Sequence, residues 1–104
     1  MIITTINDYP GKNIEILGMV MGSTVQAKHV GKAFLAGLNA MAGGEITIYT
    51  ELLNEARNTA TQRMVAQATA WGADAIIAAR FQSCSVMDGS SEVIAYGTAV
   101  KFVG

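Results

Sequence analysis

Two residues of this chain have side chains that commonly bind transition metals or act as nucleophiles, and each occurs once. Cys84 lies in the stretch Gln-Ser-Cys-Ser-Val, and His29 lies in the turn-like stretch Lys-His-Val-Gly. A structural metal site normally takes about four protein ligands, and soft metals favour paired cysteines. The sequence has no Cys-x-x-Cys or His-Glu-x-x-His motif. Within one chain we therefore expect Cys84 to fill space in a strand and His29 to lie in an exposed loop.

A symmetric assembly changes the expectation for both residues. One cysteine or one histidine per subunit recurs about the axis of a ring, so ligands from several copies could build one site. His29 and Cys84 are accordingly the candidate ligands for a transition-metal ion. A catalytic pair would require the two side chains to lie within hydrogen-bond reach of each other. No motif predicts such a pair, so we expect no enzymatic activity and assign no catalytic residue.

Three other side chains, Tyr49, Arg57 and Trp71, are candidates for binding a small molecule. Arg57 could present a bidentate donor to an anion or to the carboxylate of a neighbouring subunit. Tyr49 and Trp71 belong to the apolar stripe of the same expected helix, where packing is the alternative role. Glu55 lies two residues from Arg57, so the two project from different sides of the helix. Asp74 is expected to fix a corner between helix and strand.

The elements that would position these residues follow from the apolar pattern. Apolar positions three and four residues apart indicate a short helix over 32–41 and a longer one from Tyr49 to Trp71, which Gly72 would end. Extended apolar stretches indicate strands over 14–26, 73–86 and 92–103, the last two joined by an Asp-Gly turn. A short apolar start, Met1 to Thr5, precedes a Pro-Gly turn.

The last strand has one face of small residues, where a helix could approach closely: Val93, Ala95, Gly97 and Ala99. Its other face is bulky and apolar, and the strand over 14–26 is also apolar on both sides, which indicates coverage of both faces. Strands, helices and a hairpin in this order predict an α+β fold with a small, mainly antiparallel sheet and two helices. We expect a single domain over residues 1–104.

Composition favours an oligomer. Charged residues make up 14% of the 104 residues and hydrophobic residues 51%, against roughly 25% charged in a typical soluble domain. The 7 basic and 8 acidic residues give a net charge of −1, so we expect no nucleic-acid partner. No apolar run approaches the ~20 residues of a membrane helix, and no signal-like start is present, so we expect a cytoplasmic protein without a membrane partner. The single cysteine fits a reducing compartment.

Several short motifs, in order over most of the chain, resemble the YbjQ-like family of small bacterial proteins. They are Gly43-Gly44-Glu45, Tyr49, Glu55-Ala56-Arg57, Gly72-Ala73-Asp74-Ala75 and Gly97-Thr98-Ala99-Val100. The family is described as "putative heavy-metal-binding". The resemblance implies a dodecin-like subunit in a ring-forming assembly, expected to be a homopentamer. Many relatives carry an Arg-Asp pair where this chain has Gly31-Lys32-Ala33, so a role for that pair does not carry over.

Three hypotheses about function follow. The first is a non-enzymatic, cytoplasmic, ring-forming protein that binds heavy metal, as the resemblance implies. The second is a small-molecule binding module that holds its ligand between subunits of a ring. The third is an enzyme that uses Cys84 as its nucleophile, for which a thiol of raised reactivity would be required.

Overall fold

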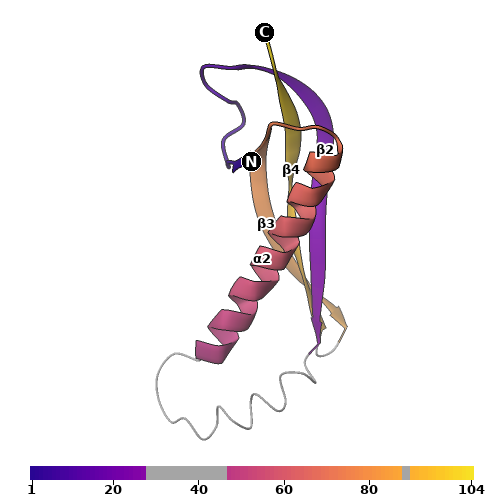
Figure 1. Ribbon diagram of the computed structural model, residues 1–104. Helices are drawn as coiled ribbons and strands as arrows, with labels where there is room; N and C mark the ends of the chain where they lie inside the picture. The colour runs from indigo at the N-terminus through magenta and orange to yellow at the C-terminus, as the bar shows by residue number, and fades with distance from the viewer. Residues whose placement is uncertain (28–46, 88–89) are drawn as a thin grey trace, which may run out of the picture.

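The computed structural model describes residues 1–27, 47–87 and 90–104, and in these ranges one long helix lies against one four-stranded sheet (Figure 1). The elements are β1 (Ile2–Ile3), β2 (Asn13–Ala27), α2 (Thr47–Ala70), β3 (Ala75–Met87) and β4 (Ser90–Val103). The strand order is β1-β3-β4-β2. The short β1 pairs with β3 in parallel, and the long strands pair antiparallel.

This arrangement confirms the α+β class and the hairpin of the last two strands, and it makes the sheet a mixed one. Of the two expected helices, the longer one is present as α2. The other, over 32–41, lies outside the described residues. No described helix combines the length and the apolar character needed to cross a membrane.

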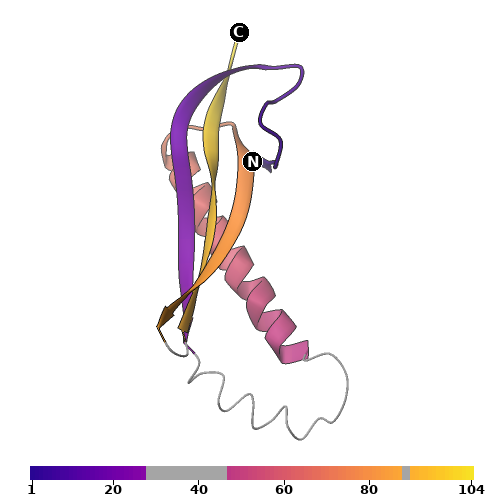
Figure 2. The same ribbon diagram turned by 180° about the vertical axis from the view of Figure 1, so that it is seen from behind.

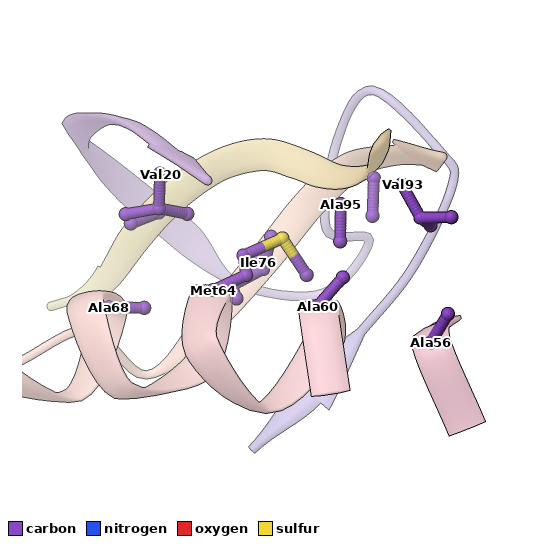
Figure 3. Packing of buried hydrophobic residues seen from close by; sticks show 10 residues of the cluster. Val20, Ala56, Ala60, Met64, Ala68, Ile76, Val93 and Ala95 are labelled. Carbon is purple, nitrogen blue, oxygen red and sulfur yellow. The ribbon is translucent and has the colours of Figure 1, made fainter. Parts of the chain in front are cut away.

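Helix α2 crosses one face of the sheet (Figures 1 and 2) and supplies four of the ten buried residues of the main core. Figure 3 shows how four residues of the expected stripe point at the sheet. They are Ala56, Ala60, Met64 and Ala68, all buried against Val20, Ile76, Val93 and Ala95. Two other residues of the expected stripe are not buried: Leu53 is 41% exposed and Trp71 is 45% exposed. Gly72 ends the helix with φ +76°, as its position predicted.

The helix comes very close to the sheet because the residues beneath it are small. A Cβ placed on Gly22 would lie 2.2 Å from the carbonyl oxygen of Ala60 and 2.4 Å from the amide nitrogen of Met64. On β4, Ala95 and Ala99 are fully buried in the same core. The small-residue face of the last strand therefore lies under the chain's own helix, as expected for a face that a helix approaches closely.

Three register shifts interrupt the pairing of the long strands, one of them between Ser85 and Met87 near the hairpin, and the other two involve residues with positive φ. The register of β2 against β4 shifts between Ile16 and Gly18, and Gly18 has φ +143° with the Trp71 ring over it. The register of β3 against β4 shifts between Ile77 and Arg80, and the intervening Ala78 has φ +53°. At each of these two sites one strand has one residue more than its partner, Leu17 in β2 and one of Ala78 and Ala79 in β3. These are β-bulges, which strengthen local twist.

The N-terminal segment is fastened to the bulge of β3. The amide of Ala78 donates to the carbonyl oxygen of Ile6 at 2.8 Å, and the amide of Ala79 donates to that of Thr4 at 3.0 Å. The guanidinium of Arg80 donates to the carbonyl oxygen of Thr5 at 2.8 Å. The bulge thus turns main-chain donors of β3 outward, where residues 4–6 accept them.

The sheet has a second face, turned away from α2, which we call the open face. Its upper end holds a small second core of Ala75, Ile77 and Val100, with Tyr9, Ile14 and Phe102 packed on it. Further along β2, the residues that alternate with Val20 and Gly22 point to this face, and before the register shift Ile16 points to it as well, because Ile16 pairs with Val100. The large apolar side chains exposed there are Ile16 (67%), Met19 (62%), Met21 (47%) and Val25 (57%). In residues 1–27, 47–87 and 90–104, one helix covers one face of the sheet, and no described helix or strand packs over the exposed part of the other.

Candidate functional site

Two of the candidate residues, Arg57 and Cys84, line one pocket near the hairpin end of the sheet. The N-terminal half of α2 diverges from the strands here (Figure 1), and the space between them has a volume of about 350 Å³. Leu53 and Arg57 line it from the helix, residues 81–85 from β3, and Ser91 and Val93 from β4. The sequence had proposed Arg57 for a small ligand and Cys84 for a metal, without predicting that they would share a pocket.

The side chains of β3 that point into this pocket can be identified from the register. Phe81, Ser83 and Ser85 pair with Ala95, Val93 and Ser91. Val93 and Ala95 belong to the core under α2, and directly paired residues project to the same face of a sheet. Phe81, Ser83 and Ser85 therefore face the helix, and Gln82 and Cys84 belong to the alternate set on the open face.

Cys84 has an acidic neighbour on the open face. It pairs directly with Glu92, and its Sγ lies 3.9 Å from Oε1 of Glu92, to which the thiol donates. Cys84 is exposed and takes part in no disulfide. Thiolate and carboxylate are both common ligands of zinc, so the pair offers two of the four ligands that a tetrahedral site requires.

The same row of the sheet continues into the apolar residues of β2. Glu92 pairs with Val25 on its other side, so Cys84, Glu92 and Val25 form one line across β3, β4 and β2. Val25 is the last of the exposed apolar residues along β2. The Cys84–Glu92 pair consequently lies at the end of the exposed apolar stretch, and any molecule covering that stretch would reach the pair.

Described residues of one chain do not complete a metal site. Across residues 1–27, 47–87 and 90–104, no group of three or more His, Cys, Asp or Glu side chains gathers closely enough to hold an ion. His29, the other candidate ligand, lies outside the described residues. The described residues of one chain thus supply two candidate ligands, Cys84 and Glu92.

The remaining candidates lie elsewhere. Trp71 follows the C-terminal end of α2, with its ring 3.4 Å from where a Cβ of Gly18 would be. It covers a bulge and does not line the pocket with Arg57. Tyr49 lies in the first turn of α2, and its side chain is outside the described ones. The three proposed small-ligand residues are therefore not shown as one site.

Arg57 is held in place by a neutral neighbour. Its guanidinium donates to Oδ1 of Asn54, one turn earlier on α2. It does not pair with Glu55, as the spacing of the two residues predicted. Asp74 accepts a 2.7 Å hydrogen bond from the amide of Phe102, and its own amide donates to the carbonyl oxygen of Val100. Asp74 thus ties the helix-to-strand corner to β4, which is the structural role expected of it.

Sequence reasoning missed Glu92 and Phe81. Glu92 was placed at the start of the last strand, but its partner across the hairpin depends on the register, which the Asp-Gly signal does not fix to the residue. Phe81 is 54% exposed beside the pocket. A large aromatic residue in a stretch otherwise rich in Gln and Ser was the signal that could have identified it.

Comparisons with known proteins agree with the family resemblance. A family model described as "Putative heavy-metal-binding" matches residues 1–103. A UPF0145 protein of Vibrio parahaemolyticus is 55% identical over 104 residues and covers 99% of both chains. One from Psychromonas ingrahamii is 55% identical over 97% of both chains, and one from Thermosipho africanus is 55% identical over 97% of this chain and 94% of its own.

A solved structure supports the fold. The crystal structure of a protein of unknown function from Pediococcus pentosaceus, of the DUF74 family, superposes with a TM-score of 0.69. The superposition covers 99% of this chain and 98% of that one, at 17% sequence identity. At this identity the likeness concerns the fold.

Proposed function

The chain belongs to the YbjQ-like (UPF0145) family, and on this premise we propose that it is a non-enzymatic subunit of a cytoplasmic ring that binds a soft divalent metal ion between its copies. The open face forms the contact between copies. Cys84 and Glu92 of neighbouring copies together supply the ligands. The number of copies, five, is what the resemblance implies.

The observation that carries the proposal is the exposed apolar stretch of the open face. Four large side chains of β2 lie there at 47–67% exposure, and burying each would contribute on the order of 1 kcal/mol or more. Contiguous apolar patches of this kind mark contact surfaces in soluble proteins. The neighbours of these residues on β4, Ile94 and Tyr96, are only partly buried, so the patch spans two strands.

The dimensions of the subunit also favour an assembly. Its radius of gyration is 17.2 Å and its longest extent is 59 Å, whereas a compact domain of about 100 residues has a radius near 13 Å. Its accessible surface is 6715 Å², against roughly 5,600 Å² for a monomeric protein of its mass. The excess, roughly 1,100 Å², exceeds the ~800 Å² that each partner buries in a standard interface.

The metal site follows from the place of Cys84 and Glu92 at the end of this stretch. One pair supplies two ligands, and pairs of other copies, gathered about the ring axis, supply the remaining ligands of a four-coordinate site. Cyclic symmetry repeats the pair about the axis, so a sparse ligand set suffices. This reading accounts for the family's description with residues that this chain has.

The assembly is tested with Met21→Glu, which places a charge in the middle of the open face. The matched control is Gln62→Glu, which adds the same charge at an exposed position of α2. Sedimentation equilibrium should show the wild type and Gln62→Glu as oligomers of one size and Met21→Glu as a folded monomer. An oligomeric Met21→Glu, or a monomeric wild type, would contradict the proposed contact.

The metal site is tested separately by competition for Zn²⁺ with a chromophoric chelator. Cys84→Ser should keep the oligomer and lose zinc, and Ser83→Ala, which changes the neighbouring residue on the opposite face, should retain zinc. Met21→Glu should also lose zinc, because a monomer has only two of the four ligands. Equal affinities of the wild type and Cys84→Ser would remove this thiol from any metal site.

A further inference from the structure

The pocket between α2 and the hairpin has apolar, polar and charged side chains that could bind a small molecule, and this does not depend on the metal proposal. Its apolar part comes from Leu53, Phe81 and Val93, and its polar part includes the hydroxyl groups of Ser83 and Ser91. Among the described residues that line it, only Arg57 carries a charge. Known small-molecule pockets combine a mainly apolar wall with a few polar groups in volumes of ~300–1,000 Å³, and this pocket of about 350 Å³ lies at the lower end.

The charge of Arg57 is not neutralised on its own helix. The positions three and four residues away on either side are Leu53, Asn54, Ala60 and Thr61, none of which is acidic. Asn54 accepts one hydrogen bond from the guanidinium and thereby fixes its position. An arginine has five N–H donors in a planar fork, so donors are left that match the two oxygens of a carboxylate.

The apolar residues of the pocket lie beside this donor. Leu53 and Arg57 are four residues apart on α2, so their side chains are neighbours on one face of the helix. Phe81 faces them from β3 and is 54% exposed, although it belongs to the helix side of the sheet. A half-exposed leucine and phenylalanine, next to an arginine with no acidic residue on the adjacent turns of its helix, are complementary to a molecule with an apolar ring and an anionic group.

We propose that this pocket binds a small aromatic carboxylate, with the carboxylate on Arg57 and the ring between Leu53 and Phe81. The site is on the helix side of the sheet, whereas the Cys84 thiol and Glu92 belong to the open face. The two proposals can therefore fail separately.

The test is a titration of the full-length protein with 2-naphthoate, followed by amide chemical shifts and carried out with a chelator present. Resonances of residues 53–57 and 81–85 should shift and saturate. Arg57→Gln should weaken binding about tenfold, as expected for loss of a charge-assisted contact, and Arg57→Lys should recover part of it. Arg63→Gln, which removes the same charge elsewhere on α2, should leave the affinity within about twofold.

A neutral analogue separates charge recognition from apolar burial. The wild type should bind 2-naphthamide about tenfold more weakly than 2-naphthoate, and Arg57→Gln should bind the two alike. Ser83→Phe, a substitution at an exposed strand position, should fill the pocket and abolish binding in a folded protein. The proposal is overturned by a wild type that does not saturate at millimolar 2-naphthoate, as when another protein segment occupies the pocket. Equal binding by Arg57→Gln, or shifts confined to the open face, would also overturn it.

Discussion

Substitution of Gly22 by alanine tests how closely the helix lies on the sheet. The added Cβ would be 2.2 Å from the carbonyl oxygen of Ala60, 2.4 Å from the amide nitrogen of Met64 and 2.7 Å from Cβ of Arg63. Two of these atoms are main chain of α2, so no side-chain rotation relieves the collision. The helix would have to move outward by about 1 Å to restore ordinary contact distances, and it would pull Ala60 and Met64 out of the core.

The expected cost is about 3 kcal/mol, the upper part of the range for overpacked cores. Gly11→Ala is the matched control, because its Cβ would meet nothing within 4 Å and only its φ of +84° opposes the change. This control should lose about 1 kcal/mol. Both are measured by urea unfolding at one protein concentration, since the stability of an oligomer depends on concentration. Equal losses for the two variants would refute the close approach of α2 to β2.

Three further substitutions probe single contacts. Ala78→Gly should stabilise the protein by about 0.5–1 kcal/mol, measured as a rise in Tm, because glycine tolerates the φ of +53°; a lower Tm would contradict the bulge. Asp74→Ala should lower the free energy of unfolding by about 1 kcal/mol, measured in urea, because the Phe102 amide loses its acceptor. Asp74→Asn keeps an acceptor oxygen and should lose less. Equal losses for the two variants would argue against that hydrogen bond. Gln67→Ala should speed hydrogen exchange of the Met21 amide, which donates to Oε1 of Gln67 at 2.9 Å, and unchanged exchange would exclude this contact.

The elements were predictable because each has a local signal. The helical spacing from Ala56 to Ala68 identified the buried stripe of α2, and the glycine that ends this helix has the positive φ expected of it. The Asp-Gly pair identified the hairpin of β3 and β4. The alternation of small residues on β4 predicted the face that the helix covers. In each case a short stretch of sequence carries the preference for the local structure.

The site was less predictable because it depends on distances between elements. Leu53 and Trp71 fit the helical stripe but are exposed, since the first half of α2 diverges from the sheet and Trp71 follows the last helical residue. The pairing of Cys84 with Glu92 depends on a register interrupted by two shifts in β3. The parallel contact of β1 involves only two residues and has no periodic signal. Such features are set by tertiary packing.

Native mass spectrometry of the wild type with Zn²⁺ tests the central claim most directly, because one spectrum reports the number of copies and of bound ions. The account predicts a single closed assembly that retains zinc, and the same assembly without zinc for Cys84→Ser. A wild-type monomer, or an assembly whose zinc content is unchanged by Cys84→Ser, would contradict it.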